Sequence, residues 1–291
     1  MASLKEVKGR IASVNGTRKI TSAMKMVASA KLHKAQAAIE NMLPYEKRLN
    51  AILTDFLRGI KDSVDSPYVE KREVKRVAIV VFSSNTSLCG GFNSNIVKHL
   101  VVVLDEYKYL GMENVLLYPV GRKVADAVKK MGFKAEGDFQ TMADKPSYAE
   151  AAELASRLME LYKRKELDKV EVIYNHFRST ALQILTREVF LPIELKTDDK
   201  PDTSGRVVSD YIVEPSSQEL LAILLPKVLR MKMYTVLLDS NASEHAARTM
   251  AMQVATDNAN DLLQDLTIMY NKSRQQAITN ELLDIIGGSM K

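Results

Sequence analysis

The stretch of sequence that decides the fold is residues 216–288, SSQELLAILLPKVLRMKMYTVLLDSNASEHAARTMAMQVATDNANDLLQDLTIMYNKSRQQAITNELLDIIGG. From Ser216 to Ile286 it contains no glycine and a single proline, Pro226. Ser216 followed by Glu219 is a capping-box pattern, and Gly287-Gly288 is typical of a helix end, so we predict one helix on the order of 100 Å long. Such a helix needs a long partner. Its expected apolar stripe is Ala247, Ala251, Val254, Leu262, Leu266, Met269, Ala277 and Leu283.

The other end of the chain supplies a helix of comparable length. Residues 2–43 contain no proline, and a helical pattern resumes over 45–61 after Pro44, which either kinks or restarts the helix. Small residues are frequent in both terminal stretches and allow two backbones to approach closely. We therefore predict a long antiparallel coiled coil formed by the two chain ends. The expected N-terminal stripe is Leu4, Val7, Ile11, Val14 and, after an irregularity at Asn15-Gly16, Ile20, Met24 and Val27.

The positive charge of the chain is concentrated at its start. The 41 Lys and Arg residues outnumber 36 Asp and Glu residues, giving a formal charge of +5, but Glu6 is the single acid among the first 34 residues. Such an arm fits an acidic protein, a nucleic acid or an anionic membrane, and equally a solvated helix face. The basic residues are Lys5, Lys8, Arg10, Arg18, Lys19, Lys25, Lys31 and Lys34.

Cysteine content and hydropathy indicate the compartment of the protein and its relation to a membrane. Cys89 is the only cysteine, so an intramolecular disulfide is excluded and a reducing compartment is expected. The start of the chain lacks the apolar segment of a secretory signal, and no later run approaches the roughly 20 apolar residues of a membrane span. We expect a protein that meets a membrane only through partners.

The middle of the chain differs in kind from both ends. Residues 77–82 form a continuous apolar, β-branched run, followed by a polar glycine turn and a helical pattern. The alternation continues, which predicts an open, mainly parallel, Rossmann-like α/β domain. The expected strands are 77–82, 115–120, 170–175, 181–190 and 207–213, the expected helices are 94–109, 121–131 and 148–165, and a loop is expected at 197–205. The predicted divisions are 1–62 and 216–287 for the coiled coil and 74–214 for the α/β domain.

The motifs do not predict a catalytic, cofactor-binding or metal-binding site. The turn SLCGGFN at residues 87–93 precedes a helix as a phosphate-binding loop does, but neither GxxxxGK[ST] nor GxGxxG occurs, so a structural turn is favoured. Cys89 is expected to be a buried structural thiol. The remaining candidates, expected to be structural or solvated, are His33, His99, His176, His245 and Asp198-Asp199.

Motifs at both ends resemble a known family. The start contains RKITSAMKMVA at 18–28, and the C-terminal part contains SEHAARTMAM at 243–252, ATDNA at 255–259, YNKSRQ at 270–275 and ITNELLDIIGG at 278–288. In this order they closely resemble the gamma subunit of the F-type rotary ATP synthase. The turn LCGG at 88–91 is similar to that of its bacterial members. The resemblance covers both terminal helices densely and the middle in outline.

The resemblance implies a mechanical function. In that family the coiled coil is a shaft inside a hexamer of alternating alpha and beta subunits, and the α/β domain lies at its foot with the epsilon subunit and the membrane rotor ring of c subunits. Because the shaft lacks threefold symmetry, rotation driven by proton or sodium flow biases each catalytic beta subunit differently. The implied protein is a non-catalytic, peripheral subunit at the cytoplasmic face of the bacterial membrane, without cofactor, nucleic-acid partner or membrane insertion of its own.

The resemblance also implies which residues contact partners. Lys19 and Lys25 complement the acidic C-terminal lever of the beta subunit, and Met24 and Arg248 mark the zone where the shaft meets it. An apolar tip turns inside an apolar sleeve of the hexamer; it comprises Leu282, Leu283, Ile285 and Ile286. Residues that match a contact with a beta-subunit loop are Arg274, Gln275, Thr279, Glu281 and Asp284, and Tyr211 and Glu214 match positions near the rotor ring.

The chain departs from the family pattern at three places. Ser289 stands where alanine is usual, Gln253 where lysine is frequent, and Asn85-Thr86-Ser87 where Asp-Arg-Gly usually precedes the glycine turn. Loss of that arginine is expected to change how the central domain meets its neighbours.

Two other classes of function stay open at this point. A nucleic-acid-binding or scaffold protein with a basic helical arm needs aromatic or base-reading residues among the basic ones, and no aromatic residue precedes Tyr45. An α/β enzyme with helical extensions needs a convergent polar pocket near Cys89.

Overall fold

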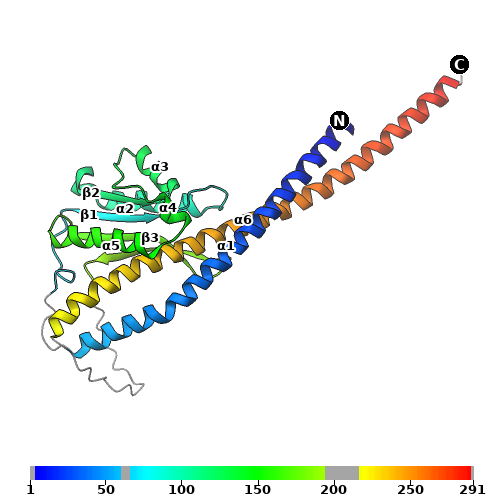
Figure 1. Ribbon diagram of the computed structural model, residues 1–291. Coiled ribbons are helices and arrows are strands. Elements are labelled where there is room, and N and C mark those ends of the chain that lie inside the picture. The colour runs from blue at the N-terminus through cyan, green and yellow to red at the C-terminus, as the bar shows by residue number, and fades with distance from the viewer. Residues whose placement is uncertain (1–3, 60–65, 194–215, 290–291) are drawn as a thin grey trace.

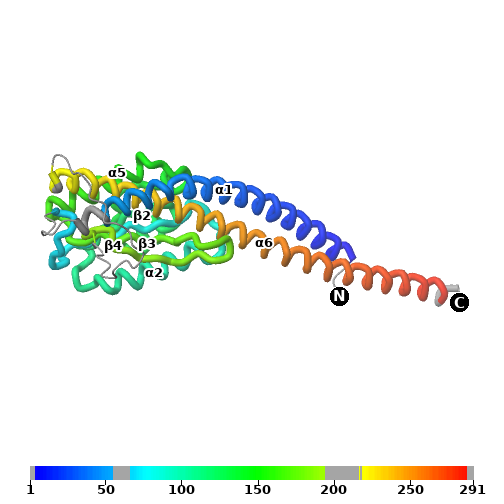
Figure 2. Tube along the Cα trace, turned by 90° about the horizontal axis from the view of Figure 1, so that it is seen from below, coloured from blue at the N-terminus to red at the C-terminus, as the bar shows by residue number. Residues whose placement is uncertain are grey.

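The computed structural model describes residues 4–59, 66–193 and 216–289 and shows a rod of two long helices joined to an α/β domain (Figure 1). Helices α1 (Leu4–Gly59) and α6 (Ser217–Ser289) have 56 and 73 residues. At 1.5 Å per residue they are about 84 and 110 Å long. Figure 2 shows the pair projecting from the domain, with the end of α6 extending past the start of α1. The predicted fold, a coiled coil of the chain ends plus a central α/β domain, is confirmed.

Both long helices continue through residues that predicted an interruption. Pro44 lies inside α1, so it does not restart the helix. The start of α6 is as predicted, because the Glu219 N–H donates to Ser216 Oγ at 3.3 Å. The expected stop at Gly287-Gly288 is wrong, since α6 extends to Ser289. A glycine costs a helix only about 1 kcal/mol, and it ends one only where the backbone turns left-handed.

The seam between α1 and α6 follows a seven-residue repeat that the apolar stripes predicted only in part. On α1 the buried and half-buried residues recur at alternating spacings of three and four without a break at Gly16. The seam residues are Leu4, Val7, Ile11, Val14, Arg18, Thr21, Lys25, Ala28, Leu32 and Ala35 on α1 and Met252, Thr256, Ala259, Leu263 and Leu266 on α6. The expected seam residues that are instead exposed are Ile20, Val27, Val254, Leu262, Met269 and Leu283.

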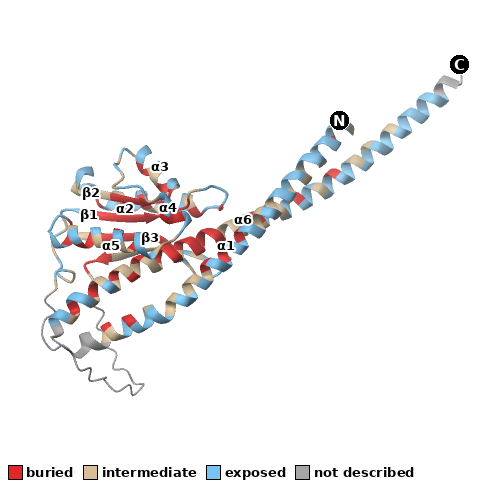
Figure 3. Cartoon of the chain, in the orientation of Figure 1, coloured by how far each residue is buried: buried red, intermediate tan, exposed pale blue. Residues whose placement is uncertain are grey.

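Polar residues in the seam explain the difference. Thr256 Oγ1 donates to Thr21 Oγ1 at 2.9 Å, and Arg18 Nη1 donates to Asn260 Oδ1 at 3.3 Å. A search for apolar residues passes over Arg18 and Thr21 and selects the neighbouring Ile20. Where small residues face each other, Ala242 and Ala246 of α6 pack against α1 and are fully buried (Figure 3).

The central domain is built on a four-stranded sheet with the order β2-β1-β3-β4. Strands β1 (Val77–Phe82), β2 (Val115–Val120) and β3 (Lys169–Phe177) are parallel. Strand β4 (Gln183–Leu191) pairs antiparallel with β3, so the mainly parallel α/β prediction is confirmed. The expected strand at 207–213, the loop at 197–205 and Asp198-Asp199 lie outside the described residues.

Helices cover both faces of this sheet. One face packs against α2 (Phe92–Glu106) and α3 (Arg122–Lys130), and the other against α5 (Tyr148–Lys163) and α6. Short helical turns complete the connections: η1 (Lys108–Leu110), η2 (Met112–Asn114) and α4 (Gln140–Asp144).

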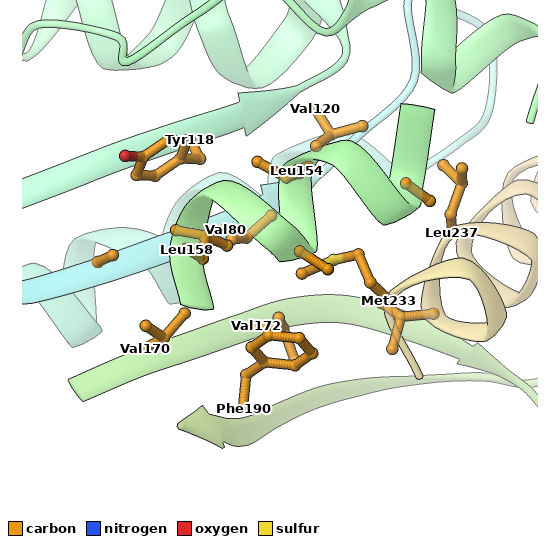
Figure 4. Close-up of a cluster of buried hydrophobic side chains, with 14 of the residues drawn as sticks. Val80, Tyr118, Val120, Leu154, Leu158, Val170, Val172, Phe190, Met233 and Leu237 are labelled. Atoms are coloured by element: carbon orange, nitrogen blue, oxygen red, sulfur yellow. The ribbon is translucent and has the colours of Figure 1, made fainter. Parts of the chain in front are cut away.

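Helix α6 also completes the core of the domain. Met233 and Leu237 of α6 are buried in one cluster with Val80 of β1, Val172 of β3 and Leu158 of α5 (Figure 4). Burial of such side chains contributes about 1.5 to 3 kcal/mol each. The domain therefore cannot form its full core without the C-terminal helix.

A buried ionic network fastens the antiparallel edge of the sheet. Glu171 of β3 is almost fully buried, and it accepts hydrogen bonds from Arg187 Nε at 2.8 Å and Tyr107 Oη at 2.9 Å. Lys169 Nζ lies 2.8 Å from the same carboxylate. Burial alone raises the pKa of Glu171, but the bonds from Arg187 and Lys169 outweigh it and hold that pKa below its usual value.

We expect Glu171→Ala to destabilise the protein by about 3 kcal/mol, because it leaves two largely buried cations without their shared partner. Urea denaturation measures this change in the free energy of unfolding. The matched control is Glu106→Ala, which removes the half-exposed partner of Arg187 and is expected to cost under about 1 kcal/mol. Equal losses in the two variants would contradict the assignment.

Candidate functional site

The shaft helix fills the carboxyl edge of the sheet. Every residue of α6 from Ser240 to Ala246 is buried, which is about two turns at roughly 3.6 residues per turn. Open α/β sheets bind their ligands in the crevice at this edge. Here the remaining cavity, lined by Phe82, Val120 and Asn241 among others, holds about 10 Å³. That volume is about what one water needs. We call residues 239–248 of α6 the collar segment.

One side of the collar segment is bonded to the end of β3. Asp239 Oδ1 accepts a hydrogen bond from the Phe177 N–H at 2.7 Å, and Asp239 Oδ2 contacts His176 Nδ1. Ser243 Oγ donates to the Asn175 carbonyl at 2.8 Å. Burial raises the pKa of Asp239 above its usual value, although the bond from His176 acts in the opposite direction. These contacts hold α6 against the last residues of the strand.

The other side of the collar segment is bonded to α4 and to the turn after β1. Asn241 Nδ2 donates to the Ala143 carbonyl at 3.0 Å. Arg248 Nη2 donates to Thr86 Oγ1 at 2.8 Å, and Arg248 Nη1 donates to Glu244 Oε1 at 2.7 Å. Burial raises the pKa of the Glu244 carboxyl even though Arg248 lies beside it. The helix is thus held from two directions.

The N-terminal helix closes the remaining side. Leu32 and Ala35 of α1 form a buried cluster with Ala242 and Ala246 of the collar segment, and Phe177 packs against it. Side chains this small allow the two helices to lie close together. Sequence patterns identified the small residues, but they gave no sign that sheet, turn and α1 would surround the same part of α6.

The glycine turn after β1 is a structural turn that rests against α6. Cys89 is buried, as predicted, with its Sγ 3.1 Å from Asn93 Nδ2. Gly90 has a φ of +59°, and a Cβ placed on it would lie 3.9 Å from the Cβ of Ala251. Asn85, which departs from the family pattern, accepts a hydrogen bond from the Arg122 N–H at 2.8 Å and donates to the Gln140 carbonyl at 2.8 Å.

In the part of the chain that the structure describes, no other helix lies beside the end of α6. Every residue from Ile278 to Ile286 is exposed, and Leu283 and Ile285 are 61% and 67% exposed. Figure 1 shows this segment beyond the start of α1. A lone helix of about this length is marginally stable in water, and large exposed apolar residues mark a binding surface. We call residues 274–285 the free tip.

A family model described as ATP synthase matches residues 3–290. The ATP synthase gamma chain of Phocaeicola vulgatus is 77% identical over 290 residues, with 100% of each chain covered. That of Bacteroides thetaiotaomicron is 62% identical over 299 residues, again with 100% of each chain covered. This chain belongs to the ATP synthase gamma chain family. These relatives give no support to the nucleic-acid-binding alternative.

Solved structures agree with the gamma chain architecture. A chain of the Euglena gracilis mitochondrial ATP synthase aligns with a TM-score of 0.63 at 20% identity, covering 99% of this chain and 93% of that one. A chain of the Tetrahymena thermophila central stalk and c-ring aligns with a TM-score of 0.58 at 22% identity, covering 81% and 99%. At these identities the likeness concerns the fold.

The structure places the predicted gamma chain contact residues in separate regions. Lys19 is exposed on α1, whereas Met24 and Lys25 are half-buried at the seam. Arg248 is largely buried, with its guanidinium directed at Glu244 and Thr86. Tyr211 and Glu214 lie outside the described residues. The residues brought together on the free tip, all exposed, are Arg274, Gln275, Thr279, Glu281 and Asp284.

A second cavity lies between α4 and α5. It holds about 220 Å³ and is lined by residues that include Asp138, Glu153 and Arg157. Ligand pockets commonly span about 300 to 1,000 Å³, and Cys89 lines neither this cavity nor the crevice. Within 4–59, 66–193 and 216–289, no cluster of three His, Cys, Asp or Glu side chains is arranged for a metal. No helix over the same ranges is both long and apolar enough to span a bilayer.

We expect His245 to make the protein less stable in mild acid. Burial, together with the nearby charge of Arg248, lowers the pKa of His245 from 6.5 to about 4. Between these values the unfolded chain binds a proton that the folded one does not, so stability falls as pH decreases from 6.5 toward 4. The full effect is about 3 kcal/mol.

Urea denaturation of wild type and His245→Gln at several pH values measures this contribution. The raised pKa of Glu244 acts in the opposite direction, but it is present in both proteins and cancels from the difference to first order. His33→Gln, at an exposed position of α1, is the matched control and should keep the wild-type profile. An unchanged profile in His245→Gln would refute the prediction.

We expect amide hydrogen exchange of the isolated chain to divide α6 sharply. Amides of residues 278–285 should exchange rapidly, because these residues are exposed, whereas those of residues 240–246 should exchange slowly because they are enclosed. Exchange detected by mass spectrometry after proteolysis measures both segments in one sample. Equal protection of the two would contradict the division.

Proposed function

We propose that this chain is the central rotary shaft of an F-type ATP synthase and couples rotation of a membrane ring of c subunits to the catalytic cycle of the beta subunits. The single observation that carries the proposal is the free tip, an exposed helix with an apolar end at the far extremity of a rod. Such a tip needs an enclosing partner, and a hexamer of alpha and beta subunits supplies one. We further propose that the chain is non-catalytic and that ATP is bound by its partners.

The shape of the rod supports an asymmetric contact with the hexamer. Among the described residues only α6 reaches the tip, and α1 begins alongside the C-terminal part of α6, so the rod has no threefold symmetry (Figure 2). Each beta subunit therefore meets a different face at any one angle. A rotation changes these contacts, and the conformation that each contact favours changes with them. A proton or sodium gradient is the expected source of the rotation.

Charge on the rod suits a sliding contact. Lys19 and Lys31 are exposed on α1, and they would attract an acidic lever of the beta subunit without forming a buried ion pair. We propose that Met24 and Lys25 contribute at the same level. Arg248 is hydrogen-bonded to Thr86. A lever that contacts Arg248 would therefore also meet the turn after β1.

The foot of the rotor is assigned to the central domain. We propose that residues 74–214 contact the epsilon subunit and the c ring, with Tyr211 and Glu214 near the ring, while 1–62 and 216–287 form the shaft. The chain would then lie at the cytoplasmic face of the membrane, held there by its partners. Its core residues from α6 join the two parts into one rotor.

Reconstitution with a catalytically competent alpha-beta hexamer tests the proposal. The hexamer is fixed to a surface, and a probe on the central domain is followed while ATP is supplied. We expect stepwise rotation in one direction and ATP hydrolysis faster than that of the hexamer alone. A folded chain that does not bind the hexamer would refute the proposal.

We expect Arg274→Ala and Glu281→Ala each to weaken binding to the hexamer about tenfold, or roughly 1.4 kcal/mol, because both side chains lie on the free tip. A titration with labelled hexamer measures the dissociation constants. Lys272→Ala is the matched control, since Lys272 is exposed on the same helix just before the free tip. Equal effects of the three substitutions would remove the special role of the tip residues.

A further inference from the structure

We propose that the collar segment is a torsional joint, in which Asn241 and Ser243 prevent the shaft helix from turning relative to the central domain. This inference rests on the proposed rotary function, in which torque passes between shaft and domain. Asn241 and Ser243 are positioning residues in this role, because they contact neither nucleotide nor the hexamer in the proposed assembly.

Apolar packing alone fixes the angle of a helix about its own axis less tightly than hydrogen bonds do. It is non-directional, and one set of alkyl contacts can be exchanged for a similar set as the helix turns. Met233 and Leu237 hold α6 to the domain in this manner. A hydrogen bond has a preferred distance and angle, so it opposes such a displacement. Arg230 Nε of α6 also donates to Ser156 Oγ at 2.9 Å, and Lys232 Nζ lies 3.0 Å from Glu188 Oε2. The collar segment adds buried bonds to main-chain groups of the domain.

The bonds of the collar segment lie on opposite sides of the helix. At about 100° per residue, Asp239 and Ser243 are close in azimuth, whereas Asn241 lies roughly 160° from Ser243. Ser243 is bonded to β3, and Asn241 is bonded to α4. Rotation of the helix in either direction must therefore strain hydrogen bonds on both of its sides.

The bonding partners make the joint stiff. Ser243 and Asn241 both donate to main-chain carbonyls, and Asp239 accepts from a main-chain N–H, so their positions are set by strand and helix backbone. Ser243 is fully buried and Asn241 nearly so. The crevice beside Asn241 holds about 10 Å³, so water cannot enter in number to replace a broken bond there.

Angular fluctuation of the rotor measures the joint directly. The alpha-beta hexamer is fixed, the rotor is halted without ATP, and a probe on a biotin acceptor peptide inserted at Gly111, an exposed turn of the central domain, reports the angle. We expect the double variant Asn241→Ala/Ser243→Ala to show larger angular variance than wild type. Ser94→Ala, at an exposed position of α2, is the control and should leave the variance unchanged.

A disulfide staple provides a second measurement, and its comparison in the otherwise wild-type joint does not depend on the double variant folding. Cys89→Ser is combined with Gly90→Cys and Ala251→Cys, whose Cβ positions are 3.9 Å apart, within the usual range of about 3.5 to 4.5 Å. Gly90→Cys strains the backbone, because φ at this position is +59°, and the reduced protein carries the same strain. In the double variant, oxidation should return the angular variance to the wild-type value. In the otherwise wild-type joint, oxidation should change nothing, because the joint is already locked; the reduced protein is the reference for each.

The outcomes separate the joint from the rotary function. Unchanged variance in a folded double variant overturns the proposal, and so does a fall in variance when the otherwise wild-type joint is stapled. If the chain does not rotate in the hexamer with ATP at all, the rotary function fails and not the joint alone. Rotation with wild-type stepping and a looser angle in the double variant is the result expected.

Discussion

The rest of the structure depends on the need to bury one face of a helix about 110 Å long. Helix α6 meets this need differently along its course. Its first part packs as a layer of the α/β domain, its collar segment is surrounded, and its next part shares a seam with α1. Only the free tip stays unpacked, and this is the part that the proposed hexamer would enclose.

The collar segment reconciles a familiar fold with the proposed mechanical function. An open α/β sheet offers a crevice at the carboxyl ends of its strands, and in many proteins a ligand occupies it. Here a segment of the same chain fills the crevice, and the small cavity that remains is lined by Ser83, which follows β1, and by Ser240 of the helix. The edge of the sheet that commonly serves chemistry holds the shaft instead.

Much of the architecture was predictable from local pattern. The β-branched run at Val77–Phe82 and the cap at Ser216 each carry their signal within a few residues, and the family motifs identified both ends of the rotor. The seam was predicted less well, because Arg18, Thr21 and Lys25 occupy positions that an apolar pattern skips. A search that follows the alternating spacing of three and four residues, whatever the residue type, would have found the seam.

The collar segment could not be predicted from the sequence, for a physical reason. Ser243, Glu244 and His245 are polar residues in a helix, and polar residues in a helix usually face water. Their burial follows from the tertiary bonds of the collar segment, in which Ser243 is bonded to Asn175, Asn241 to Ala143 and Arg248 to Thr86, all far away in the chain. No local pattern encodes those partners, and the predicted roles of the free-tip residues stay predictions.

The pairing of the two chain ends has a consequence for biosynthesis. Thr21 contacts Thr256, a separation of 235 residues, and the core of the domain also waits for Met233. At about 5 to 20 residues per second, α1 leaves the ribosome roughly 10 to 50 seconds before its partner exists. During that interval its seam faces solvent, and the nascent chain is expected to need a chaperone or an early assembly partner to keep it from aggregating.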